Sequence, residues 1–76
     1  MHIWFVSGIC GSVAFTKEGD AIQHVKRHAS RCYKNDIPME VVSWGTYDNG
    51  TLHGFAYGLP GGDPIYYATI RKLEVR

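Results

Sequence analysis

Four histidines and two cysteines are the residues of this chain that are best suited to chemistry, as metal ligands, general bases or nucleophiles. His24, His28 and Cys32 recur every four residues, so two neighbours on a helix could bind one ion together. His24 and Cys32 would lie about 12 Å apart along the helix axis, so all three cannot share a site. Cys10 could approach one pair, but no CxxC motif supplies further ligands. We therefore expect no metal and no other cofactor, and two free thiols at Cys10 and Cys32.

Motifs of nucleophilic catalysis are missing from the sequence. It contains no GxSxG, no HExxH and no phosphate-binding loop. No histidine is spaced from a carboxylate in a way that pairs a base with an orienting acid. The glycines of Leu59–Asp63 precede a strand-like segment rather than a helix, so they indicate a turn. We expect no catalytic residues and no enzymatic activity.

Positive charge gathers in one segment of the chain. Half of its eight lysines and arginines lie there, beside His24 and His28 and offset by Asp20: Lys26, Arg27, Arg31 and Lys34. Such a cluster attracts phosphates or an acidic protein surface. Cations near the C-terminal end of a helix are also favourable by themselves, and many charged faces are only solvated. We take the four cations as candidate binding residues on one basic helix face.

Aromatic residues gather in a predicted hairpin around Asn49-Gly50, a pair that readily adopts the two positive φ angles of a type I′ turn. In the register set by that turn, Phe55 faces Trp44 and Tyr57 faces Val42. Because side chains alternate along a strand, these four share one face of the hairpin. The other face carries almost no bulk: Ser43, Gly45, Gly54, Ala56 and Gly58.

The segment His53–Tyr57, HGFAY, is similar to the first five positions of the ribonucleoprotein-1 box of RNA-recognition motifs. Ile3–Val6 resembles the other box of that family. The resemblance implies a sheet face that binds single-stranded RNA or DNA, with Trp4, Phe55 and Tyr57 stacking on bases. The sequence departs from the family after Tyr57, where Gly58 and Leu59-Pro60 interrupt the box, and the family's second helix is missing.

The same aromatic face has two other interpretations. It can be the hydrophobic core, which we favour, because a domain of 76 residues can hardly leave its largest side chains outside. A buried pair of Trp44 and Phe55 would contribute a few kcal/mol, at about 25 cal/mol per Å² of apolar area. It can also be the buried half of a dimer interface. The candidate residues of the aromatic face are Trp4, Trp44, Phe55 and Tyr57.

The elements that must position these residues follow from apolar periodicity. Strands are predicted at His2–Ser7 and, shorter, at Ser12–Phe15, then the hairpin strands within Glu40–Tyr57, and a last strand at Ile65–Val75. Thr16 or Asp20 can cap a helix, whose apolar stripe comprises Ala21, Ile22, Val25, Ala29, Cys32 and Tyr33. The helix should end between Lys34 and the Ile37-Pro38 step. This predicts an α+β fold: one amphipathic helix on an antiparallel sheet of four to five strands, in the order β-(β)-α-β-β-β, as a two-layer sandwich.

The composition restricts the setting of the protein. The formal net charge is +1, which gives no overall attraction to nucleic acid or membrane. No apolar run approaches the roughly 20 residues that span a bilayer, and the first residues lack the basic start of a secretory signal. Patterned sequence runs from His2 to Arg76 without a linker. We expect one complete domain over residues 1–76, located in the cytoplasm.

A non-catalytic protein-binding module, an inhibitor or adaptor, is the function that we expect. The chain is rich in Tyr and Trp, which dominate interface hot spots, and some of its tyrosines must lie outside so small a core. Small products of this kind are common among bacteriophage and mobile-element proteins that dock on host or defence machinery, such as CRISPR complexes. The alternative is a single-stranded nucleic-acid binder that uses the aromatic face and the basic helix. Strand pairing could also produce a homodimer.

Overall fold

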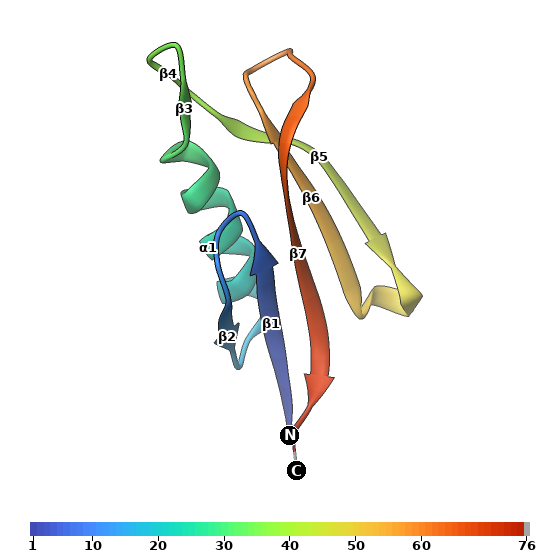
Figure 1. Ribbon diagram of the computed structural model, residues 1–76. Helices are drawn as coiled ribbons and strands as arrows, with labels where there is room; N and C mark the ends of the chain where they lie inside the picture. Colours follow the sequence, from blue (N-terminus) through green and yellow to red (C-terminus); the bar gives the residue numbers. More distant parts are fainter. Residues whose placement is uncertain (76) are drawn as a thin grey trace.

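The computed structural model describes residues 1–75 and consists of one helix, a five-stranded antiparallel sheet and a small two-stranded hairpin (Figure 1). In chain order the elements are β1 (His2–Gly8), β2 (Val13–Phe15), α1 (Glu18–Ser30), β3 (Tyr33–Lys34), β4 (Ile37–Pro38), β5 (Glu40–Tyr47), the 3₁₀ turn η1 (Asp48–Gly50), β6 (Leu52–Gly58) and β7 (Pro64–Glu74). The strands of the large sheet lie in the order β2-β1-β7-β6-β5. The predicted α+β two-layer fold is confirmed, and Arg76 lies outside the described residues.

The helix forms where three small or branched residues recur every four positions. Ala21, Val25 and Ala29 are each completely buried against the sheet. Neither predicted capping residue lies at the start of α1: the N-cap is Lys17, whose side chain makes no capping hydrogen bond. Two acidic residues in the first turn, Glu18 among them, favour this helix start through the helix dipole instead.

The predicted C-terminal end of the helix is wrong. The amides of Arg31 and Cys32 donate to carbonyls three residues earlier, at 3.0 and 3.1 Å, which tightens the last turn and ends α1 at Ser30. Tyr33 and Lys34 then leave the helix and pair in register with Pro38 and Ile37 in the β3–β4 hairpin. Asn35 and Asp36 make its tight turn with φ angles of 52° and 64°, which these two residue types tolerate better than most.

The predicted turn of the main hairpin is confirmed. Asn49 and Gly50 have φ angles of 57° and 87°, and the Thr51 amide donates to the Asp48 carbonyl at 3.2 Å. The register also holds from Tyr47 opposite Leu52 down to Trp44 opposite Phe55. It fails beyond Ser43, because a bulge at Val42 shifts the strand by one residue and places Tyr57 opposite Val41.

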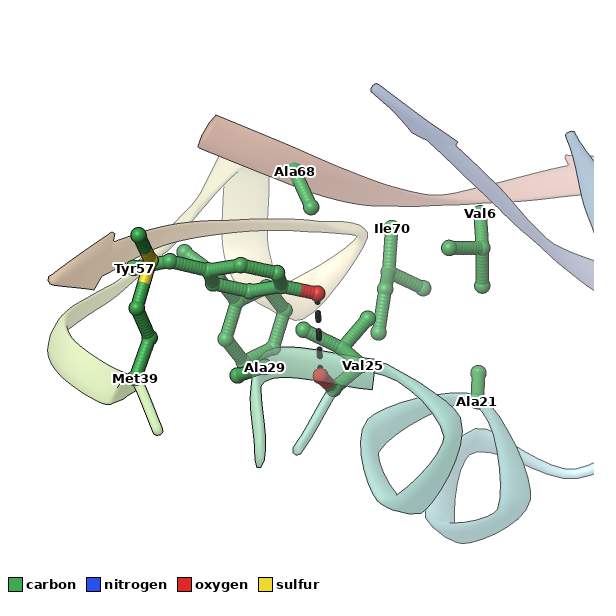
Figure 2. Packing of buried hydrophobic residues seen from close by; sticks show 9 residues of the cluster. Val6, Ala21, Val25, Ala29, Met39, Tyr57, Ala68 and Ile70 are labelled. Atoms are coloured by element: carbon green, nitrogen blue, oxygen red, sulfur yellow. Dashed lines mark hydrogen bonds between the residues drawn. The ribbon is translucent and has the colours of Figure 1, made fainter. Parts of the chain in front are cut away.

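The core lies between α1 and one face of the sheet, as Figure 2 shows. Val6 of β1, Ile70 of β7 and Tyr57 of β6 are completely buried there, facing Ala21 and Val25 of the helix. The Tyr57 hydroxyl donates a hydrogen bond of 2.9 Å to the Val25 carbonyl, so a polar atom in the core is satisfied by the helix backbone. Met39, 3% exposed, closes the end of the core nearest the small hairpin.

Among residues 1–75 no helix or strand covers the opposite face of the sheet, which we call the open face. Alternation along the paired strands assigns these residues to it: Ile3, Phe5, Ser7, Ala14, Glu40, Ser43, Gly45, Tyr47, Leu52, Gly54, Ala56, Gly58, Tyr67, Thr69, Arg71 and Leu73. The small residues of the main hairpin, among them Gly45, Gly54 and Ala56, therefore face away from α1. Within residues 1–75, the helix is too short and too polar to cross a membrane.

Candidate functional site

The aromatic candidates divide between the core and its margin. Phe55 and Tyr57 are 2% and 0% exposed, so the core interpretation is confirmed for these two, and neither ring offers a free face to a base. Trp4 is partly buried against the core, with the Lys72 ammonium 5.6 Å from its ring centre. Trp44, on the edge strand β5, stacks on Phe55 at 5.1 Å and stays 45% exposed.

A buried histidine, His53, lies between the two tryptophans. Its Nε2 atom is 2.9 Å from Glu18 Oε2, at the start of α1. On the other side of the ring, Trp44 Nε1–H donates to Nδ1 at 3.4 Å, and the Thr46 hydroxyl lies 3.0 Å from the same atom. Because the indole nitrogen can only donate, Nδ1 must be the acceptor, and the ring carries its hydrogen on Nε2, toward the carboxylate. Trp4 stacks on the ring at 5.8 Å.

The His53 ring thus connects the Glu18 carboxylate to the Thr46 hydroxyl in a carboxylate–imidazole–hydroxyl series. The sequence spacing did not indicate this pairing of a histidine with a carboxylate. Glu18 and His53 are 35 residues apart, so only the packing of α1 on β6 brings them together. In this series the Nδ1 lone pair already accepts from an indole, which leaves it poorly available to a nucleophile. Neither groove described below is lined by Thr46. The arrangement suits a structural role: it ties the first turn of the helix to the sheet.

The four basic candidates do not form one face. The Lys26 ammonium lies 5.3 Å from the ring centre of Trp44, on the flank of α1 toward β5. Arg27 and Arg31 line a groove on another part of the helix surface. Lys34 is exposed on β3, beyond the end of the helix. The structure therefore brings together only the two arginines.

The groove on the helix has a volume of about 710 Å³, and we call it the helix groove. Its lining comprises Phe15, Gly19, Asp20, Gln23, His24, Arg27, His28 and Arg31. The ring of His24 packs against Phe15 at 5.3 Å, and the ring of His28 packs against Tyr57 at 5.9 Å. His24 Nε2 is buried without a hydrogen-bond partner among the described residues. The groove thus has an aromatic lining and an excess of positive charge.

The two cysteines lie near Tyr57, each as a free thiol. Burial raises the pKa of the Cys10 thiol, and a hydrogen bond with Tyr57 opposes this in part. Burial likewise raises the pKa of the Tyr57 hydroxyl, with the neighbouring thiols adding to the effect. Cys32 Sγ lies 3.4 Å from the His28 carbonyl and 3.7 Å from its Nδ1. Within residues 1–75 no three His, Cys, Asp or Glu side chains are arranged to hold a metal ion.

The open face carries a shallow depression of about 220 Å³ between two tyrosines. Tyr47 and Tyr67 are 57% and 65% exposed. The Tyr47 ring leans over Gly45 and Gly54, since a Cβ atom on Gly45 would collide with its hydroxyl group and one on Gly54 would touch its ring at 3.5 Å. The two glycines therefore leave room for the Tyr47 ring itself, and the depression remains between this ring and Tyr67.

In comparisons with known proteins, no family model matches the sequence, and no curated protein and no solved structure is significantly similar to it.

Proposed function

We propose that this protein is a non-catalytic protein-binding module, an inhibitor or adaptor, and that it binds its partner with the open face of the sheet. The observation that supports this most directly is the pair of exposed tyrosines, Tyr47 and Tyr67, on a sheet face with no second layer. Tyrosine supplies a large contact area with few rotatable bonds and a hydroxyl for hydrogen bonding, and it is enriched in interface hot spots.

The charge of the open face defines the partner surface that would fit. Two of its strand residues are charged: Arg71 and, at the opposite end of the face, Glu40. The neighbours of Arg71, which are Leu52, Phe5 and Leu73, are apolar. A complementary surface would present apolar side chains, one of which enters the depression between the tyrosines, and a carboxylate opposite Arg71. A nucleic-acid strand would find one cation here, and the stacking residues Phe55 and Tyr57 lie on the other face, inside the core.

We propose that the protein is located in the cytoplasm, as the sequence led us to expect. Two cysteines without a disulfide suit the reducing cytoplasm. The proposed partner is a component of a host or defence complex, of the kind that small phage and mobile-element proteins bind. A homodimer through the uncapped edge of β5 would be compatible with this role, because that edge adjoins the open face without covering it.

The test compares two neighbouring tyrosines on β7. Tyr67→Glu changes the open face, whereas Tyr66→Glu places the same change on the opposite side of the strand, at a residue that is 41% exposed. Affinity-tagged protein is used to capture the partner in cells, and the purified pair is then titrated by calorimetry. We expect Tyr67→Glu to weaken binding about thirtyfold or more, as a hot-spot tyrosine does. Tyr66→Glu should change it by less than threefold, and melting curves check that both variants fold.

Equal binding by the two variants would place the interface elsewhere and contradict the proposal. A second titration follows tryptophan fluorescence with short single-stranded RNA and DNA at two salt concentrations. Saturating quenching that weakens with salt would favour the nucleic-acid alternative.

A further inference from the structure

The helix groove contains two positive charges without an ionic partner. Arg27 and Arg31 both line it, and the one ion pair among residues 1–75 is that of His53 with Glu18. Arg27 in the last turn of α1 and Arg31 at its C-cap are four residues apart, which at helical spacing places their backbone positions about 6 Å apart along the axis. Two like charges at this spacing disfavour the helix by a few tenths of a kcal/mol. The helix dipole favours cations near the C-terminus, but it does not require both to lie on the flank that borders a groove.

Two chemical features of the groove suggest what would bind there. The arginines present planar donors that match the two oxygens of a carboxylate. In the same groove the rings of Phe15 and His24 pack together at 5.3 Å. An apolar side chain of a ligand can pack against these two rings. A ligand with two anionic groups about 6 Å apart, and an apolar group beyond the anion that binds Arg27, on the side of His24, would satisfy both features. Residues i and i+2 of an extended peptide are spaced at nearly this distance and point to the same side, so an apolar residue two positions further along extends toward Phe15.

We propose that the helix groove binds an acidic segment of a protein, with carboxylates on Arg27 and Arg31 and an apolar side chain against Phe15. This inference rests on the proposed function, because the segment would belong to the same partner that covers the open face. A protein segment fits better than a nucleic acid for two reasons. Asp20 lines the same groove and would repel a continuous row of phosphates. The most exposed aromatic rings, among them Trp44 and Tyr67, lie outside the groove and could not stack on bases bound in it.

The chain offers a control that is matched in charge. Arg27→Gln with Arg31→Gln removes two charges from the groove. Lys26→Gln with Lys34→Gln removes two charges from the same basic segment, at residues that do not line the groove. The probe is a fluorescein-labelled peptide, Ser-Leu-Ser-Glu-Ser-Glu-Ser, whose leucine and two glutamates share one side when the chain is extended, and its binding is followed by fluorescence anisotropy. The same peptide with lysine in place of both glutamates, a thymidine decamer and inorganic phosphate are titrated in parallel.

The acidic peptide should bind the unchanged protein, and the double arginine variant should bind it about tenfold more weakly. The double lysine variant should lose less than twofold, and binding should weaken as salt rises from 50 to 300 mM. Equal losses in both variants would show general charge attraction and overturn the inference, as would the absence of peptide binding. Tighter binding of the thymidine decamer with the same arginine dependence would assign the groove to nucleic acid.

This experiment can fail independently of the proposed function. Tyr67→Glu should leave peptide binding to the groove unchanged, since Tyr67 is on the opposite side of the sheet. If the peptide does not bind but Tyr67→Glu still releases the partner, the open face remains the interface and only the groove is excluded. If the peptide binds and Tyr67→Glu retains the partner, the groove remains and the open face is excluded.

Discussion

Truncation of Phe55 should remove a large part of the folding free energy. The side chain is 2% exposed and stacks on Trp44 at 5.1 Å. Phe→Ala at a buried site costs about 3–5 kcal/mol, from lost transfer energy and the cavity that remains. A domain of 76 residues has a total stability of about 4–11 kcal/mol at typical values per residue. Phe55→Ala should therefore remove at least about a quarter of the free energy of unfolding, and all of it if the total lies at the low end of this range.

Two milder substitutions, Phe55→Leu and Trp44→Ala, extend the measurement of unfolding free energy to a graded series. Phe55→Leu keeps most of the volume and should cost about 1–1.5 kcal/mol. At about 2.1 cal/mol/K of unfolding entropy per residue, this lowers the Tm by roughly 6–9 °C. Trp44→Ala removes the stacking partner at a position that is 45% exposed, so we expect it to cost clearly less than Phe55→Ala. Urea unfolding followed by circular dichroism gives all three values.

The result that would refute this reasoning is a small loss of stability. If Phe55→Ala lowers the free energy of unfolding by less than about 1 kcal/mol, the side chain is not part of the core. An exposed stacking residue would instead lose about 1–3 kcal/mol of nucleic-acid binding at nearly constant stability. The same variant thus separates the two interpretations of the aromatic face.

Two further predictions concern pH and a tight turn. Because burial raises the folded-state pKa values of Cys10 and Tyr57, the unfolded chain releases these protons first. The stability that these two groups contribute should be constant below about pH 8 and should fall as pH rises past the unfolded pKa values near 8.5 and 10. Urea titrations at several pH values measure this fall, and Tyr57→Phe should remove the tyrosine part of it. Gly8→Ala should destabilise by about 2 kcal/mol or more, measured by thermal melting, since a Cβ there would lie 2.6 Å from the Tyr67 carbonyl oxygen at φ +113°. A Gly11→Ala variant, with open space around it, is the control for steric collision, and an equal effect of the two would contradict the packing argument.

Local signals predicted much of the fold. Asn49-Gly50 specified the hairpin turn because few other pairs accept two positive φ angles, and the period of Ala21, Val25 and Ala29 specified the buried side of α1. The errors arose where local patterns compete. Cys32 and Tyr33 continue the helical period, but the tight turn at Asn35 and Asp36 pairs the following residues as strands.

The candidate site was less predictable, because it depends on packing between distant segments. A helical wheel places Lys26 and Arg27 100° apart and on one polar side. Only the position of α1 on the sheet shows that Lys26 lies over Trp44 while Arg27 borders the groove with Phe15. Likewise, no sequence spacing joins Glu18 to His53, whose contact spans 35 residues.

The two proposed surfaces have one physical origin: a chain of 76 residues has too few residues outside the sheet to cover it completely. A helix of 13 residues is about 20 Å long, whereas the molecule extends over 44 Å. The helix therefore covers only part of one sheet face, and residues 1–75 contain no second α-helix for the open face. Trp44, on the edge strand, stays 45% exposed. Apolar and aromatic side chains at such positions contribute little to the stability of the isolated chain. A partner that supplies the missing layer would bury them, and this is why we assign the open face to binding rather than to folding.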